Sequence, residues 1–242
     1  MIKTQMEVQC KKLTSFWMRQ EYKSVKDKFE KPFSLTLENL GLDNSLKTEL
    51  KLMQNYKGLG CTVWDGSIVL TKLFEHDTDL RKHLMQSRVV ELGAGCGLVG
   101  IALVHLGTKF VMMTDMEVCL QTLRENVKHN CQKFKNIEVK SYVWGDDIGS
   151  LVEEHGQFDV IVAAEVLYDE NSSRLLALSA QKLLAKDGMM FVSMGRNRNG
   201  QGIFKDVMVK HGYGIEDIPN ERLHPLYQDE IIKVIKVTKN DQ

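Results

Sequence analysis

Short apolar runs alternate with longer amphipathic stretches over residues 58–242. The predicted strands are Arg88–Leu92, Phe110–Thr114, Ile137–Val143, Phe158–Ala164 and Met189–Met194. The helices predicted between them are Leu98–Leu106, Glu117–Asn130 and Asn171–Leu184, where apolar residues recur at helical spacing. Strands that alternate with helices form βαβ units with right-handed crossovers. The pattern therefore predicts an α/β fold with a mostly parallel sheet and helices on both faces.

The C-terminal part of the pattern differs from the rest. A helix is predicted near Gly202–Lys210, followed by strands at Tyr213–Ile218 and Glu230–Thr238. No helical pattern separates these two strands, so we expect them to form an antiparallel hairpin at one edge of the sheet. Together with the strands before them, they predict a Rossmann-like, seven-stranded sheet with an antiparallel C-terminal edge hairpin.

Residues 1–57 are polar, rich in lysine and weakly patterned, which predicts an N-terminal extension before a domain over residues 58–242. Within the extension, residues 9–29 suit a helix. Two short alternations, Phe33–Glu38 and Glu49–Gln54, suit a β-hairpin. The segment Gly66–Glu75, at the start of the domain, is expected to be a helix.

Composition narrows the class of protein. The 32 basic and 32 acidic residues balance, which argues against a dominant phosphate-binding surface, so no nucleic acid is expected as partner. The five cysteines include no Cys-x-x-Cys pair, so we expect reduced thiols, no zinc site, and a location in the cytoplasm and also the nucleus. No signal-peptide core opens the sequence and no apolar run approaches a membrane span, so no membrane is expected as partner.

The most informative segment runs from Val89 to Gly100, where an apolar strand leads through closely spaced glycines into an apolar helix. Glycine permits a sharp turn and lets a ligand lie against the backbone. The N–H groups at the start of the helix point at such a ligand. The segment therefore predicts a nucleotide-type pocket at the carboxyl edge of a parallel sheet.

Two ligands compete for this pocket. Gly95–Gly100 matches the dinucleotide fingerprint Gly-x-Gly-x-x-Gly, and Asp115 follows about 20 residues later, where a ribose-binding acid is expected. Glu91–Gly95 reads Glu-x-Gly-x-Gly, which suits S-adenosylmethionine with the same geometry. A structural turn without a ligand is the third interpretation, so these residues leave the ligand open.

Two later strand ends carry further candidates. Trp144 follows the third predicted strand, where its indole either stacks on an adenine or caps the core. Glu165 and Tyr168 follow the fourth strand and either face one pocket or begin a solvated helix. The carboxyl ends of parallel strands line the ligand crevice in such sheets, which favours a shared site without deciding it.

Taken together, residues 50–238 resemble the seven-β-strand S-adenosylmethionine-dependent methyltransferases, and more narrowly their family-16 members, which act on protein lysines. The resemblance rests on Gly60–Leu70, Val89–Ile101, Thr114–Asp115, Trp144–Gly145 and Ala164–Tyr168. The Trp-Asp-x-x-Ile-Val-Leu stretch ahead of the glycines is its most specific part, because general dehydrogenases have no such element.

The resemblance implies a role for each site residue. The implied cofactor-binding residues are Trp64, Glu91, Gly93, Ala94, Gly95, Asp115, Trp144 and Ala164. Asp115 would hold the ribose, while Trp144 and Ala164 would border the adenine and methionine ends. Glu165 and Tyr168 would be catalytic, because they match the family's Asp-x-x-Tyr motif beside the target amine. Glu165 is one methylene longer than the family's Asp, and no metal is implied.

The implied function is methyl transfer from S-adenosyl-L-methionine, leaving S-adenosyl-L-homocysteine, to a lysine of a non-histone protein of the chaperone or AAA ATPase class. The expected partner is a protein that presents this lysine, and the enzyme is expected to be a monomer. Residues 1–57 match the family poorly and are candidates for substrate selection. The open alternatives are another acceptor (histidine, an N-terminus or a small molecule), an NAD-dependent oxidoreductase, and an inactive binding module.

Overall fold

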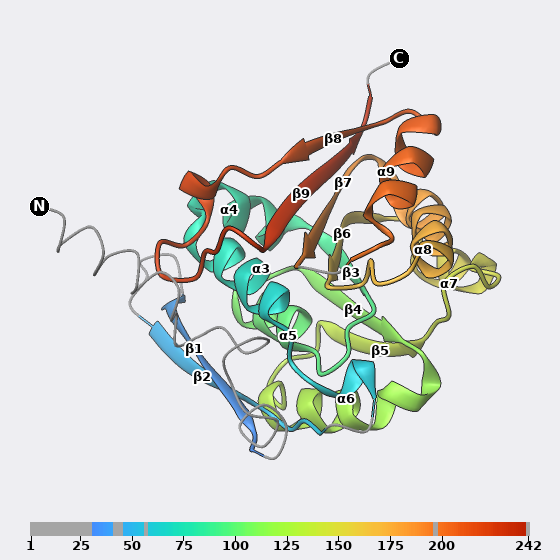
Figure 1. Ribbon diagram of the computed structural model, residues 1–242. Helices are drawn as coiled ribbons and strands as arrows, with labels where there is room; N and C mark the ends of the chain where they lie inside the picture. The colour runs from blue at the N-terminus through green and yellow to red at the C-terminus, as the bar shows by residue number, and fades with distance from the viewer. Residues whose placement is uncertain (1–30, 41–45, 56–57, 196–197, 241–242) are drawn as a thin grey trace, which may run out of the picture.

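The computed structural model describes residues 31–40, 46–55, 58–195 and 198–240 (Figure 1). The helix predicted within residues 9–29 lies outside these ranges. The described residues form a seven-stranded sheet and a separate two-stranded hairpin. Among them, no helix is long and apolar enough to span a bilayer.

The seven strands lie in the order β5-β4-β3-β6-β7-β9-β8. Their bounds are β3 Arg88–Leu92, β4 Phe110–Asp115, β5 Ile137–Ser141, β6 Phe158–Ala164, β7 Leu184–Met194, β8 Tyr213–Asp217 and β9 Lys233–Lys239. The first five pair in parallel, whereas β9 pairs antiparallel with both β7 and β8. The predicted fold class is confirmed, and β9 rather than β8 lies next to the parallel strands.

The strand order reverses between β3 and β6. The chain runs outward from β3 through β4 to β5, and then returns to place β6 on the other side of β3. The loops that leave β3 and β6 therefore diverge at the carboxyl edge of the sheet, which opens a crevice between them. This reversal positions the site described below.

Seven α-helices cover the sheet within the described residues (Figure 1). Their bounds are α3 Asp65–His76, α4 Thr78–Gln86, α5 Leu98–His105, α6 Glu117–Asn130, α7 Gly149–His155, α8 Glu170–Leu183 and α9 Gln201–Lys210. Alternate strand residues point to opposite faces, so Val89 and Val90 belong to two different cores. One core includes α3, α4, α5 and α6, and the other includes α7, α8 and α9.

The helices α4 and α7 were not predicted from the sequence. In α4 only Leu80, Arg81 and Leu84 are buried, and in α7 only Leu151 is. So few apolar positions give a weak helical period. The predicted strand Ile137–Val143 was too long by two residues, because the chain leaves the sheet after Ser141.

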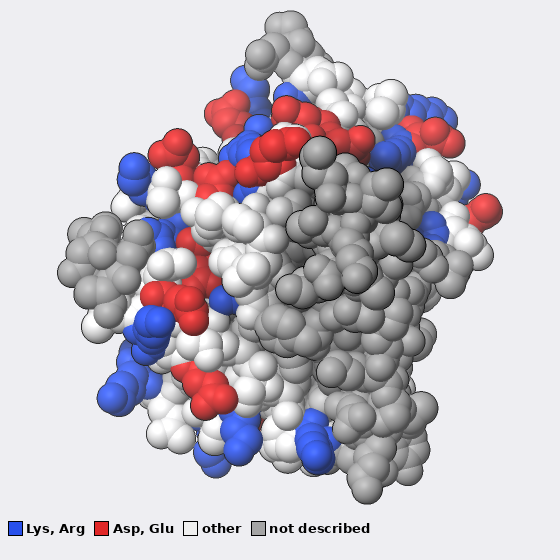
Figure 2. All heavy atoms as spheres, turned by 60° about the vertical axis from the view of Figure 1, so that its left-hand side comes forward, with Lys and Arg blue, Asp and Glu red and all other residues white. Residues whose placement is uncertain are grey.

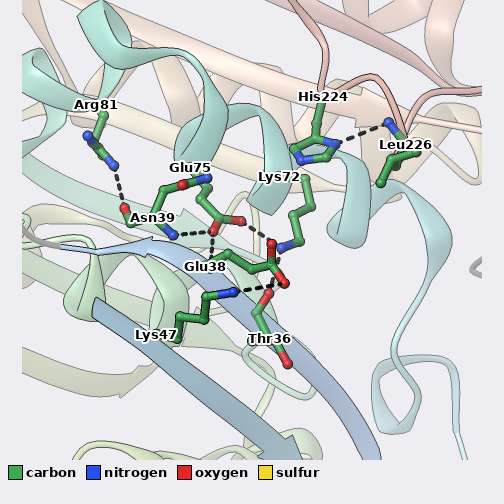
Figure 3. A network of polar contacts seen from close by, with 9 residues as sticks. All are labelled: Thr36, Glu38, Asn39, Lys47, Lys72, Glu75, Arg81, His224 and Leu226. Carbon is green, nitrogen blue, oxygen red and sulfur yellow. Dashed lines mark hydrogen bonds and ion pairs between the residues drawn. The ribbon is translucent and has the colours of Figure 1, made fainter. Parts of the chain in front are cut away.

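The predicted hairpin is present as β1 Phe33–Leu40 and β2 Leu46–Leu52, with Leu35 opposite Leu50. All of its leucines except the exposed Leu46 share one core with α3 and α5. A buried ion pair also holds it (Figure 3): Lys72 Nζ lies 2.6 Å from Glu75 Oε2, and the side chains are 2% and 0% exposed. Lys72 donates to the Thr36 carbonyl, and Glu75 accepts the backbone N–H groups of Glu38 and Asn39. The hairpin is thus fixed to α3 by charge and by packing.

The charged surface follows the balanced composition. Figure 2 shows lysine and arginine side chains interspersed with aspartate and glutamate over the described part of that face, with acidic groups gathered toward its upper edge. Among the described residues in that view, no single broad basic area stands out.

Candidate functional site

One cavity of about 240 Å³ lies at the carboxyl edge of the sheet. It is lined by every predicted site residue: Trp64, Glu91, Gly93, Ala94, Gly95, Asp115, Trp144, Ala164, Glu165 and Tyr168. These residues come from the ends of β3, β4 and β6, from the turn after β5 and from the start of α3. The tertiary fold therefore brings together all the residues that the sequence singled out.

The glycine loop joins β3 to α5 and forms the floor of the cavity. Its backbone folds back onto β4, because the N–H groups of Gly93 and Ala94 both donate to the Thr114 carbonyl, at 3.0 and 2.9 Å. Gly93 has φ +75°, and a Cβ there would lie 2.9 Å from the Trp144 ring. Both the backbone conformation and the close approach of the indole therefore require glycine at this position.

Asp115 ends β4 and is buried beside this loop. One carboxylate oxygen accepts the N–H of Gly95 at 2.7 Å, and the other accepts the N–H of Met116 at 2.7 Å. The carboxylate also takes part in a hydrogen bond with the Cys119 thiol, and with about four lone-pair sites it can still accept from a ligand hydroxyl. Burial, with the charge of Asp115, raises the pKa of the neighbouring Cys119 to about 12. Cys119 therefore lines the cavity as a neutral thiol at physiological pH.

Glu91 lies deeper, at 2% exposure, and Oε2 accepts the N–H of Gly100 at 2.9 Å. Burial is the main reason that the pKa of Glu91 is raised to about 8, and the charge of Asp115 acts in the same direction. Without a ligand, this carboxyl is therefore mostly protonated at pH 7. A cationic ligand in the cavity would favour its ionised form.

Aromatic rings form the walls. The ring centroids of Trp144 and Tyr168 lie 6.3 Å apart with a tilt of 36°, and Tyr168 is exposed at the mouth. The turn that carries Trp144 is anchored to α8, because the N–H of Gly145 and the hydroxyl of Tyr142 both donate to Ser179 Oγ. An aromatic pair held in this way can flank a flat ligand group.

Glu165 lines the cavity, but its carboxylate is held by contacts that the sequence did not indicate. It has φ 61°, an uncommon conformation for a side chain with a Cβ, and its side chain is 1% exposed. Oε1 accepts the N–H of Gly66 at 3.0 Å, and Oε2 accepts the N–H of Gly195 at 3.0 Å. Oε2 also accepts a hydrogen bond from Arg198 Nε at 2.7 Å, and it forms an ion pair with Arg198 Nη2 at 2.6 Å. Glu165 thereby joins the start of α3 to the segment after β7.

Several cavity residues were missed by the sequence reasoning. The main ones are Met116, Cys119, Ser172 and Arg198. The rule that strand ends line the crevice could have found Met116 and Arg198, since they follow β4 and β7.

One group among the described residues has side chains close enough to share a metal ion: Glu138, Glu154 and His155, with ligand atoms within 4.8 Å of one another. These residues lie on β5 and α7, and none of them lines the cavity. Lys140 Nζ already lies 3.1 Å from Glu154 Oε1, so the carboxylates there have a cation as partner.

Comparisons with known proteins agree on one family. The family profile described as lysine methyltransferase matches residues 44–211. Protein N-lysine methyltransferase METTL21A of Xenopus tropicalis is 31% identical over 173 residues, which cover 70% of this chain and 76% of the relative. EEF1A lysine methyltransferase 3 of Xenopus tropicalis is 27% identical over 197 residues, covering 79% and 82% of the two chains.

Solved structures show the fold. The glycopeptide N-methyltransferase MtfA in complex with S-adenosyl-L-homocysteine is similar with a TM-score of 0.55 and 12% identity, covering 71% of this chain and 90% of that one. The CurJ carbon methyltransferase is similar with a TM-score of 0.55 and 16% identity, covering 73% of this chain and 55% of that one. Of the two ligands that suit the glycine loop, membership of the lysine methyltransferase family favours the methyl donor over a dinucleotide.

Proposed function

Since this chain belongs to the lysine methyltransferase family and its methyl donor is S-adenosylmethionine, we propose that it methylates a lysine ε-amine of a non-histone protein. The observation that carries the proposal is the single cavity in which the glycine loop and Asp115 lie together with Glu165 and Tyr168. A donor and an acceptor must meet in one closed space for direct transfer, and this cavity has suitable groups for both.

The cofactor is assigned to the β3, β4 and β5 ends. Asp115 binds the ribose hydroxyls, which is supported by its position beside the loop, where one oxygen accepts the N–H of Gly95 and the other that of Met116, each at 2.7 Å. Trp144 flanks the adenine, and its contact with Gly93 supports this role. The remaining cofactor residues are Trp64, Glu91, Gly93, Ala94, Gly95 and Ala164. Ionised Glu91 complements the positive sulfonium, which suits a carboxyl that titrates near pH 8.

The acceptor lysine is assigned to the β6 end, where Tyr168 lies at the mouth. Methyl transfer needs the lone pair of a neutral amine, whereas free lysine has a pKa near 10.4, so deprotonation at pH 7 costs about 4–5 kcal/mol. The amine nitrogen forms a bond to the methyl carbon while the carbon–sulfur bond breaks and its electron pair stays on sulfur. Holding these three atoms in line can supply about 7–11 kcal/mol. Tyr168 offers a hydroxyl and a ring face to the side chain.

The class of substrate protein rests on sequence alone. His224–Ile232 is similar to the corresponding tail of the lysine methyltransferase that acts on valosin-containing protein, so we propose a substrate of the AAA ATPase or chaperone class. Residues 1–57 are proposed to contribute to its selection. A cytoplasmic and nuclear location and a monomeric state remain predictions.

The test is transfer of labelled methyl groups from S-adenosylmethionine into cell extract, followed by mass spectrometry of the labelled band. We expect a labelled lysine with the wild-type chain and loss of the label with Glu165→Ala. Glu165→Gln is measured beside Glu165→Ala as the milder change, because a glutamine oxygen can still accept the N–H of Gly66. The matched control is Glu153→Gln, an exposed carboxylate on α7 outside the cavity. Label on histidine, on an N-terminus or on a small molecule would contradict the acceptor, and full activity of Glu165→Ala would contradict the site.

A further inference from the structure

Arg198 is a cavity residue to which no role has yet been given. It follows β7, its side chain is 12% exposed, and it lines the same cavity as the glycine loop. Its guanidinium carbon lies 5.5 Å from the centre of the Trp64 ring, Nε donates to Glu165 Oε2, and Nη2 forms an ion pair with the same oxygen. A guanidinium keeps its charge throughout the physiological range. Arg198 therefore places a fixed positive charge at the acceptor end of the cavity.

The ion pair of Arg198 and Glu165 affects the charge state of an amine that enters the acceptor end of the cavity. Glu165 Oε2 already accepts bonds from Gly195 and Arg198, and Oε1 accepts from Gly66. An incoming ammonium would have to compete with Arg198 for this carboxylate. A lone carboxylate stabilises the ammonium form of a nearby amine, whereas a carboxylate paired with a guanidinium presents no net charge. The reaction needs the opposite of a stabilised ammonium, namely a neutral amine.

We propose that Arg198 is a positioning residue that closes Glu165 into a neutral ion pair, so that the acceptor lysine loses its proton to water before transfer. This inference rests on the proposed function and deepens it. It also refines the catalytic role that the resemblance implied for Glu165, because the carboxylate orders Gly66 and Arg198 and does not hold the substrate ammonium. The neutrality of the pair likewise makes it a poor anchor for the carboxylate of the methionine tail.

Other titratable groups face the same space and enter any pH dependence. They are Glu91 on β3, Cys96 in the glycine loop, Asp115 on β4, Cys119 on α6, Tyr142 after β5 and Tyr168 after β6. Glu91 is the one whose titration falls near pH 8. The inference is therefore tested by differences between variants, in which these shared contributions cancel.

Sinefungin is a suitable probe, because it is an S-adenosylmethionine analogue with an amine in place of the transferable methyl group. S-adenosyl-L-homocysteine lacks that amine and serves as the reference. The experiment is calorimetric titration of the full chain with each compound at pH 7 and pH 9.5. The quantity compared is the affinity for sinefungin relative to S-adenosyl-L-homocysteine, which reports how the site treats a charged amine.

We expect Arg198→Gln to raise this relative affinity about tenfold at pH 7, which corresponds to one pKa unit, and less than threefold at pH 9.5. Glu165→Gln should lower it by a similar factor at pH 7, because Arg198 is then uncompensated. The double variant Arg198→Gln/Glu165→Gln should return to the wild-type value, and so should Arg198→Lys. Arg174→Gln, an exposed arginine on α8, is the matched control.

The inference is overturned if the relative affinity does not change in Arg198→Gln, or if it changes equally at both pH values. A tenfold loss of S-adenosyl-L-homocysteine affinity in both variants that carry glutamine at position 198 would place the methionine carboxylate on Arg198 instead. Thermal unfolding shows whether Arg198→Gln folds. If it does not, the inference is tested by the opposite shift in relative affinity that is expected of Glu165→Gln and by the return to the wild-type value in the double variant. If the relative affinities shift as expected but no methyl group is transferred to lysine, only the proposed acceptor is contradicted. If the chain binds neither sinefungin nor S-adenosyl-L-homocysteine, the proposed function and the role of Arg198 are both contradicted.

Discussion

The carboxylate of Asp115 accepts the backbone N–H of Gly95 at 2.7 Å, across the gap between two neighbouring strand ends. The residue proposed to bind the ribose is therefore also part of the scaffold that shapes the glycine loop. A substitution at this position changes a ligand contact and the loop conformation together, and the first prediction separates these two effects.

Asp115→Ala is expected to weaken S-adenosylmethionine binding at least tenfold, since a charge-assisted hydrogen bond contributes about 1.5–3 kcal/mol. Asp115→Asn keeps an oxygen that can accept the N–H of Gly95, so it should retain the loop and lose only the charge. Calorimetric titration measures both, with Asp147→Asn, an exposed carboxylate outside the cavity, as control. Equal affinities of Asp115→Ala and the wild type would show that another group holds the ribose.

Glu91 has a pKa near 8 in the folded chain, far above its usual value of 4.5. Its contribution to stability is fully present below pH 4.5, and it declines as the pH rises toward 8, because only the unfolded chain ionises there. Glu91→Gln removes this decline. The free energy of unfolding of the variant should therefore match that of the wild type near pH 4.5 and exceed it by roughly 4 kcal/mol at pH 8 without cofactor.

Urea denaturation at several pH values between 4.5 and 8 measures this effect as the difference in the free energy of unfolding between Glu91→Gln and the wild type. An advantage that is the same at every pH would mean that the carboxyl does not titrate in this window.

Gly66 lies so close to Glu165 that a Cβ there would be 2.5 Å from Oε1. Gly66→Ala should displace the carboxylate and destabilise the fold by about 1–3 kcal/mol, the usual range for overpacking, with loss of methyl transfer. Gly202→Ala is a matched control, because it is also near the start of a helix and a Cβ there meets nothing within 4 Å. The control should be stabilised by about 0.4–1 kcal/mol. Thermal and urea unfolding measure both, and a Gly66→Ala variant as stable as the control would refute the close contact.

The buried pair of Lys72 and Glu75 allows a double-mutant test (Figure 3). Lys72→Met leaves Glu75 as an uncompensated buried charge and should cost about 3–5 kcal/mol. Lys72→Met/Glu75→Gln removes both charges, and the glutamine oxygen can still accept the N–H groups of Glu38 and Asn39. The double variant should therefore be more stable than Lys72→Met alone in urea unfolding. The charges are not coupled if the double variant loses as much free energy of unfolding as Lys72→Met and Glu75→Gln lose together when each is measured alone.

The local pattern predicted the elements with a strong period. Glu117–Asn130 and Phe158–Ala164 begin and end in the structure where the sequence placed them, because their apolar positions repeat at 3.6 residues or form one buried run. The helix α4 was missed because most of its residues face solvent. The hairpin strands were predicted, but nothing local indicates that β9 inserts between β7 and β8.

By itself, the sequence determined the alternation of strands and helices, the glycine loop and the residues that follow each strand. These are local properties, since backbone conformation and apolar period depend on near neighbours. Only the tertiary structure decided that Arg198 meets Glu165 and that Gly66 makes room for the carboxylate. Such contacts join residues far apart in the chain. A carboxylate that looks like an open ligand in the sequence becomes one half of an ion pair once β6 and β7 lie side by side.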